Sequence, residues 1–154
     1  MTPIRTETLP QPAAVLGTAG LVPFIVLAVQ VVTGGLFPNS WMEAALYALL
    51  IYGAVVLSFL GGIQWGLAVI SADRSDAWRR YGFSVLPPMV AWLAVWWNGP
   101  EGLVLLAVGI AVWAAYELWS TGLGEAPQWY GRLRLILSLI AVLCLGASAK
   151  YGPF

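Results

Sequence analysis

The residues of this chain that could do acid–base or ion-binding chemistry are few, and Glu117 is the most informative of them. It lies near the end of one apolar segment, and Arg132 and Arg134 come at the start of the next. A carboxylate in apolar surroundings is costly unless water, a proton or a cation relieves it. We favour a structural ion pair or a hydrated interface residue. The alternative is a site that binds a cation or carries a proton.

Two amide side chains also interrupt apolar segments. Gln64, beside Trp65, lies near the end of one segment, and Gln30 lies toward the end of an earlier one. An amide in such a place bonds to a neighbouring helix or reaches interfacial water. Helix-to-helix hydrogen bonding is the favoured interpretation, and a contact to a ligand is the alternative. For Gln64, a proton or ion path shared with Glu117 is a further alternative.

Trp92 and Trp113 lie deep within their apolar segments. The plain interpretation is that they fill space between helices, and the sharper one is that they line a pocket for a planar or lipid-like ligand. The consecutive Pro87 and Pro88 remove two amide donors and obstruct the preceding turn, so we expect a kink or a local break there. Such a bend could shape a cavity.

The inventory excludes several kinds of catalysis. The chain has no histidine and one cysteine, Cys144, which rules out an internal disulfide, histidine and cysteine metal sites, and bis-histidine haem ligation. We find no histidine to act as the base for a serine nucleophile, no phosphate loop and no dense pair of carboxylates. The expectation is a protein that is not an enzyme and has no metal or other cofactor. The formal net charge of zero offers no basic face for nucleic acid.

The composition identifies the solvent. Of the 154 residues, 60% are hydrophobic and 9% are charged, whereas soluble domains have about 45–50% apolar and about 25% charged residues. So few charges cannot cover so much apolar surface. The expected partner is therefore a lipid bilayer.

Five apolar stretches approach the roughly 20 residues that a membrane-spanning helix needs. They run over about 13–37, 41–70, 81–97, 102–120 and 133–149. The sequence thus predicts an all-α membrane protein, a bundle of five transmembrane helices, with a tail over 1–12 and a single membrane domain over 13–154. Asn98, Gly99 and Pro100 predict a tight turn that makes a hairpin of the third and fourth helices.

The basic residues predict the orientation. With five crossings, Arg5, Arg74, Arg79, Arg80, Arg132 and Arg134 share one side, and the other side holds Lys150 alone. Basic residues stay on the side from which the chain inserts. The N-terminus is therefore expected inside, in the cytoplasm or the mitochondrial matrix, and the C-terminus outside.

Small residues recur at every fourth position of the second helix: Ala54, Ser58, Gly62 and Gly66. A stripe of this kind lets two helix backbones approach closely. Packing within the bundle is the favoured interpretation. The alternative is a contact surface for a second copy or for another membrane protein.

Four motifs spread along the chain resemble one family. They are LGTAGLVPF at 16–24, FLGGIQWG at 59–66, YGFSVLP at 81–87 and PQWYGRLR at 127–134. Together they resemble the transmembrane protein 69-like family, a domain of unknown function (3429). The resemblance implies a small multi-pass protein of bacterial inner membranes, with relatives in mitochondria, and it supplies no activity, substrate or binding residue.

These observations favour a non-enzymatic accessory or assembly protein that interacts with a larger inner-membrane complex. A second hypothesis is a binder or carrier of a hydrophobic small molecule or lipid, in a pocket that includes Trp92 and Trp113. A third is a proton or ion pathway through Glu117 and Gln64.

Overall fold

The computed structural model describes residues 8–70, 77–124 and 126–153, and all regular structure in these ranges is helical. The tail arginine Arg5 and the loop arginine Arg74 lie outside the described residues. The helices are α1 (Gln11–Ala19), α2 (Val22–Thr33), the short 3-10 helix η1 (Asn39–Trp41), α3 (Met42–Ile70), α4 (Ala77–Trp97), α5 (Gly99–Gly122) and α6 (Gln128–Tyr151).

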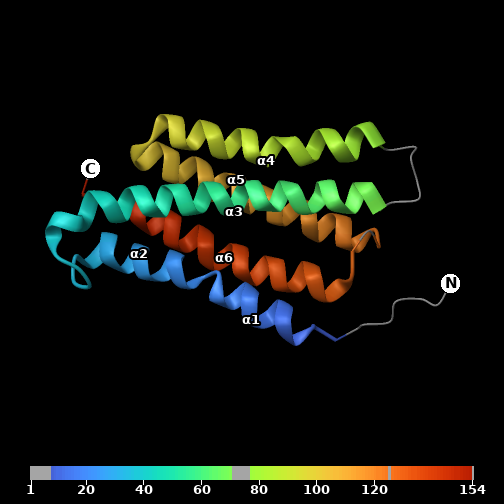
Figure 1. The fold of residues 1–154 in the computed structure, drawn as a ribbon, viewed down its shortest axis with the longest axis horizontal. Coiled ribbons are helices and arrows are strands. Elements are labelled where there is room, and N and C mark those ends of the chain that lie inside the picture. The colour runs from blue at the N-terminus through green and yellow to red at the C-terminus, as the bar shows by residue number, and fades with distance from the viewer. Residues whose placement is uncertain (1–7, 71–76, 125, 154) are drawn as a thin grey trace.

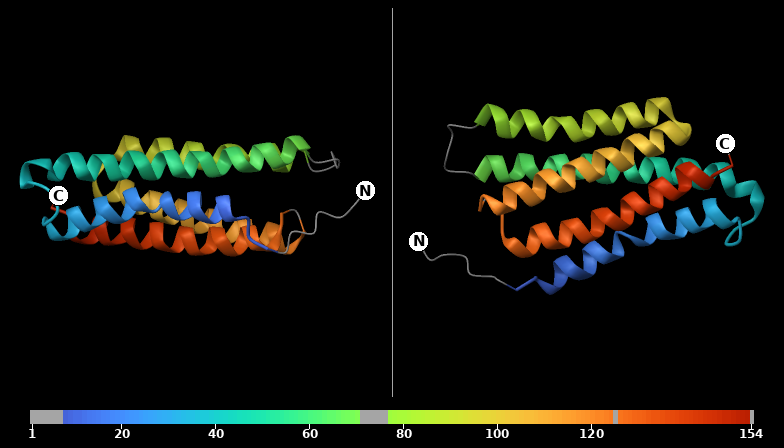
Figure 2. Two further views of the ribbon diagram at one scale, coloured as in Figure 1. Left: turned by 60° about the horizontal axis from the view of Figure 1, so that its bottom comes forward. Right: turned by 180° about the vertical axis from the view of Figure 1, so that it is seen from behind.

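The long helices lie side by side along one axis, and each runs opposite to the one before it (Figure 1). The exception is the pair α1 and α2, which run in the same direction, one after the other. Helix α4 packs against α3 and α5 at one edge of the bundle, and α1 contacts α6 at the opposite edge (Figure 2). The most extensive packing joins α5 to α6 and α3 to α4.

The predicted single helix over residues 13–37 is wrong, because the chain breaks between α1 and α2. Pro23, in the first turn of α2, has no amide hydrogen to donate to the carbonyl of Ala19. The carbonyl of Gly20 in the break accepts a hydrogen bond of 2.8 Å from the Tyr52 hydroxyl of α3. The end also falls short of 37, since Gly34 adopts a left-handed conformation (φ 66°) that stops α2.

Helix α3 matches the predicted range 41–70 to within one residue, whereas α4, α5 and α6 begin earlier or end later than the apolar stretches indicated. Helix α4 begins at Ala77 instead of residue 81, and α6 covers Gln128–Tyr151 instead of 133–149. Hydropathy marks where a chain is apolar, whereas helical hydrogen bonding continues into polar flanks. The tight turn is confirmed: Asn98 alone separates α4 from α5, with φ 54° followed by 58° at Gly99.

Contrary to the favoured interpretation, Gln30 does not bond to a neighbouring helix. Its side chain is fully buried and folds back onto the loop after its own helix. The side-chain oxygen accepts hydrogen bonds from the amides of Leu36 and Phe37 at 2.9 and 2.7 Å, and the side-chain nitrogen donates to the carbonyl of Phe37 at 3.2 Å. Backbone amides that leave a helix need new partners, and the buried Gln30 side chain supplies them to this loop.

Helix α4 continues through Pro87 and Pro88 without a break. Because Pro88 has no amide hydrogen, the carbonyl of Ser84 loses its helical partner. A Cβ atom on Gly61 of α3 would clash with that carbonyl oxygen and would lie 2.9 Å from Pro88 Cδ. The bare glycine therefore lets α3 and α4 approach closely at the proline pair.

The predicted packing stripe is only partly inside the bundle. Ala54 is buried and Ser58 is half-buried, but Gly62 and Gly66 are exposed. Within the described part of the chain, a Cβ atom built on either glycine would meet nothing within 4 Å. The face of α3 that packs inward instead contains Gly53, Leu57, Leu60, Gly61 and Gln64. The expectation of internal packing is thus wrong for the two glycines, because the α3–α4 contact falls one residue earlier, at Gly61.

The core is aliphatic and the outer surface is equally apolar. Leu49, Leu57, Leu106, Ile110 and Leu145 are almost completely buried between α3, α5 and α6. Many large apolar side chains point outward, among them Phe59, Val69, Val112, Ile136 and Leu143. In water, apolar patches of this extent would drive aggregation, whereas lipid tails solvate them.

Adjacent glycines give a matched test of the α3–α4 contact. We expect Gly61→Ala to destabilise the fold by about 1–3 kcal/mol, because the added methyl group meets backbone that cannot move aside. Gly62→Ala is the control, since its site is open. Thermal unfolding of the two variants in the same detergent measures the difference. Equal melting temperatures would contradict the close approach at Gly61.

Candidate functional site

Glu117 of α5 lies at the centre of a buried polar cluster. None of its side chain is exposed. One carboxylate oxygen, Oε1, accepts a hydrogen bond of 2.8 Å from the Tyr130 hydroxyl, and the other, Oε2, accepts one of 2.9 Å from Nε of Arg134. The ion pair and the hydroxyl together replace the hydration that the carboxylate loses, which confirms the structural pairing favoured from the sequence.

The cluster depends on a close approach of α5 and α6. A Cβ atom on Gly131 would lie 2.9 Å from the hydroxyl oxygen of Thr121, so only glycine leaves room there. That hydroxyl donates a 2.7 Å hydrogen bond to the carbonyl of Glu117, one turn earlier in α5. Tyr130 and Arg134 are four residues apart and therefore share the face of α6 that this approach brings to Glu117.

The two arginines named from the sequence have different places. Arg134 is largely buried in the ion pair, whereas Arg132 is exposed and takes no part in it. Two residues along a helix correspond to about 200° of rotation, so both cannot face α5. Tyr130, which the sequence presented only as part of the motif PQWYGRLR, is the missing third member. Helical spacing from Arg134 is the signal that points to it.

Gln64 and Trp65 lie apart from this cluster, on α3. Gln64 is buried on the inner face of the helix, as expected for an intrabundle amide. Trp65 is half exposed and packs edge-on against Tyr81 of α4, with ring centroids 4.8 Å apart. Trp65 therefore helps to hold α4 against α3 near the ends of these helices.

The two deep tryptophans also separate. Trp113 is buried and lines a cavity of about 320 Å³ between α3, α4 and α5, together with Phe83, Pro87 and Tyr116. Trp92 is 57% exposed and contacts Trp96 on the outside of α4. The expectation that Trp92 fills space between helices or lines this pocket is wrong, because it lies on the outward face of an edge helix.

These features define a class of protein. Within the described residues, four helical segments are long and apolar enough to cross a membrane: Gln11–Thr33, Asn39–Ile70, Gly99–Gly122 and Gln128–Tyr151. Two of them, α5 and α6, hold the Glu117 carboxylate buried between them, and the outer surface is apolar. This is the architecture of a multi-pass helical membrane protein.

Comparison with known proteins names the family. The chain belongs to the family described as protein of unknown function (DUF3429), whose family model matches residues 9–150. It is 38% identical over 143 residues to transmembrane protein 69 of Xenopus tropicalis, which covers 90% of this chain and 54% of that protein. It is 28% identical over 137 residues to transmembrane protein 69 of Mus musculus, covering 87% and 54%.

The chain thus spans about half the length of these curated relatives. No solved structure matches it. The family assigned by resemblance from the four sequence motifs is confirmed, and so is the multi-pass membrane class.

Neighbouring arginines provide the test of the buried ion pair. We expect Arg134→Met to cost about 3–5 kcal/mol of unfolding free energy, because it leaves the Glu117 carboxylate buried without a cation. Arg132→Met, two residues away and exposed, should change stability by no more than about 0.5 kcal/mol. Denaturant unfolding in detergent micelles measures both.

The double variant Glu117→Gln with Arg134→Met supplies the control for charge. Because it removes both charges, it should be more stable than Arg134→Met alone. Equal losses for Arg132→Met and Arg134→Met would show that the ion pair contributes nothing to the fold.

Proposed function

We propose that this protein is a non-enzymatic accessory protein that crosses the membrane five times and binds another membrane protein through the outer face of α3. Its N-terminus lies on the cytoplasmic side of a bacterial inner membrane, or on the matrix side of the mitochondrial inner membrane in a eukaryote. Its C-terminus lies on the opposite side.

The direction of the helices supports a fifth crossing. Helices α3 and α5 run the same way through the bundle and are both candidate spans. For both to begin on one side of the membrane, α4 has to carry the chain back between them. Its 21 residues are about 31 Å long at 1.5 Å per residue. Its hydropathy is lowered by arginines, by the proline pair and by tryptophans, which are suited to the membrane interface.

The described basic residues support the orientation. Arg79 and Arg80 lie in the first turn of α4, and Arg132 and Arg134 lie near the start of α6, so all four are at the same end of the bundle. Lys150 lies in the last turn of α6, at the other end. Because arginines stay on the side from which the chain inserts, the end of the bundle with the four arginines is the inner end.

The buried ion pair of Glu117 supports a non-enzymatic role. Glu117 is satisfied on both oxygens by Arg134 and Tyr130. A carboxylate held in this way has its hydrogen-bonding capacity committed to the fold. It is therefore better placed to join α5 to α6 than to carry protons or to bind a cation.

The observation that carries the interaction role is the open pair Gly62 and Gly66. Gly61 and Gly102, inside the bundle, lie close against the backbone of a neighbouring helix. A Cβ atom built on Gly62 or Gly66 meets nothing within 4 Å among the residues that the structure describes. Two glycines four residues apart form a flat surface on which a second helix backbone can pack. We assign that place to a transmembrane helix of another protein.

Replacing both glycines tests this role. The double variant Gly62→Ile with Gly66→Ile fills the open surface without a clash in the bundle, so the monomer should fold and lose its companion by at least about tenfold, as expected when small-residue packing of helices is blocked. Native mass spectrometry of protein extracted with its own lipids measures the mass of the companion. Gly146→Ile on α6, which is also open, is the matched control.

Retention of the companion by the double glycine variant would contradict the assigned surface. A mass equal to two copies of this chain would show that the partner is a second copy and not another protein. A bare monomer from gently extracted native membranes would remove the basis for an accessory role.

A further inference from the structure

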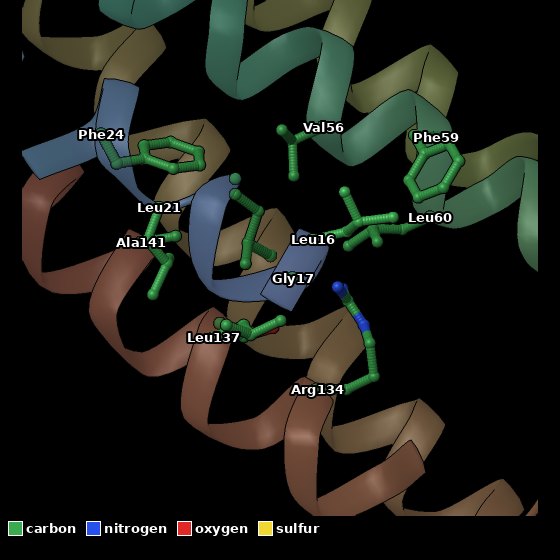
Figure 3. Close-up of a pocket in the computed structure, with 13 residues that line it drawn as sticks. Leu16, Gly17, Leu21, Phe24, Val56, Phe59, Leu60, Arg134, Leu137 and Ala141 are labelled. Carbon is green, nitrogen blue, oxygen red and sulfur yellow. The ribbon is translucent and has the colours of Figure 1, made fainter. Parts of the chain in front are cut away.

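A second cavity lies on the opposite side of the bundle from Trp113, where the chain breaks between α1 and α2. Its volume is about 160 Å³. Figure 3 shows side chains of α1, α2, α3 and α6 converging on it. Its apolar wall includes Leu21, Phe24, Val56, Leu60 and Ala141. Gly20, in the break, also lines the cavity.

Two polar side chains of α6 line this apolar cavity. Arg134 and Ser138 are four residues apart and so share one helix face. The Ser138 hydroxyl oxygen is buried and has no hydrogen-bond partner in the described parts of the chain. A buried hydroxyl without a partner carries a desolvation cost, and this one lies where a bound molecule could remove that cost.

The guanidinium of Arg134 faces the same space. Its Nε atom donates to Glu117, and in Figure 3 its nitrogen-bearing end points between Leu60 and Gly17. Arginine has five N–H donors in a planar fork, so pairing at Nε leaves its terminal nitrogens with donors to offer. Arg134 and Ser138 together present hydrogen-bond donors at one end of an apolar chamber.

The neutral charge of the Glu117–Arg134 pair determines which hydrogen-bond acceptor a ligand can bring into the cavity. The carboxylate of Glu117 neutralises Arg134, so a ligand with an ionised head group would add an uncompensated negative charge within the membrane, which is costly. An uncharged oxygen acceptor adds no such charge. A carbonyl group is the matching chemistry, because it accepts hydrogen bonds and donates none.

The size and the opening of the cavity limit the rest of the ligand. An apolar cavity of about 150 Å³ holds one benzene molecule, so about 160 Å³ holds one ring or a short stretch of acyl chain. Leu16 and Phe59, which also line the cavity, are largely exposed on the outer surface. The opening between them leads toward lipid, where a longer apolar tail can extend.

We propose that this cavity binds an uncharged apolar molecule through a carbonyl oxygen that accepts hydrogen bonds from Arg134 and Ser138. Two sources share this chemistry: the acyl ester of a bilayer lipid, and a ring carbonyl compound such as a quinone with an apolar tail. The proposal does not rest on the accessory role, although Phe59 at the cavity opening shares the exposed face of α3 with Gly62 and Gly66.

The experiment uses the full chain in nanodiscs made of ether-linked lipids, which contain no ester carbonyl. The probe is a decyl-substituted benzoquinone labelled with ¹³C at its carbonyl groups, and decylbenzene is the matched molecule without an acceptor. Native mass spectrometry measures binding, and isotope-edited infrared spectroscopy measures the carbonyl stretch. We expect the quinone to bind more tightly than decylbenzene, with its carbonyl stretch moved to lower frequency.

Two serine variants test the position. Ser138→Ala removes one donor at nearly constant volume and should weaken quinone binding by about tenfold, in line with one hydrogen bond. Ser148→Ala is the control, since Ser148 is also buried on α6 without a partner in the described residues but does not line the cavity. Circular dichroism of both variants checks that the helices are intact.

Repeating the titration in ester-lipid nanodiscs separates the two sources. A lower apparent affinity for the quinone there assigns the cavity to a lipid ester, and an unchanged affinity assigns it to ring carbonyl compounds. Equal binding of decylbenzene and quinone, or equal affinities for Ser138→Ala and Ser148→Ala, would overturn the proposal. The proposal would also be overturned if neither the quinone nor the ester lipid bound, because the cavity would then be a site for water.

Discussion

The structure depends on one constraint, which is that the hydrocarbon interior of a bilayer supplies no water to polar groups. Every donor and acceptor carried into the membrane needs a partner within the protein. The Glu117 carboxylate meets this requirement through Arg134 and Tyr130, and the amides of the loop after α2 meet it through Gln30. At each place one polar side chain satisfies another group and thereby fixes how two segments lie together.

The same constraint explains where the helices approach closely and where they separate. Gly131 lets α5 and α6 come together around the ion pair, and Gly61 lets α3 receive the part of α4 that contains the proline pair. At the edge of the bundle, the chain breaks just before Pro23, and a cavity lined by Gly20 of this break and by Arg134 lies there. One buried arginine therefore takes part in both a structural ion pair and the wall of a candidate binding chamber.

The sequence was sufficient to predict the lipid environment, the family and the ion pairing of Glu117. Each of these follows from a property that can be read along the chain: apolar composition, the combination of motifs, and the cost of a buried carboxylate. It could not choose between Arg132 and Arg134, or between Gly61 and Gly62, since these choices depend on which helix face meets its neighbour. The outward position of Trp92 and the loop-directed bonds of Gln30 were missed for the same reason. Helical periodicity along α6 could have placed Tyr130, Arg134 and Ser138 on one face. Only the structure shows that this face contacts Glu117 of α5 and borders the cavity at the α1–α2 break.

The central claim, that α4 carries the chain back across the membrane, is tested most directly by the sidedness of its two ends. Single cysteines are introduced as Ala77→Cys and Asn98→Cys in a chain whose Cys144 is replaced by alanine, and a membrane-impermeant maleimide is added to intact spheroplasts. The account predicts labelling at position 98 in intact cells and at position 77 only after permeabilisation. Labelling of both positions from the same side would show that α4 does not cross, and the arrangement of five crossings would be wrong.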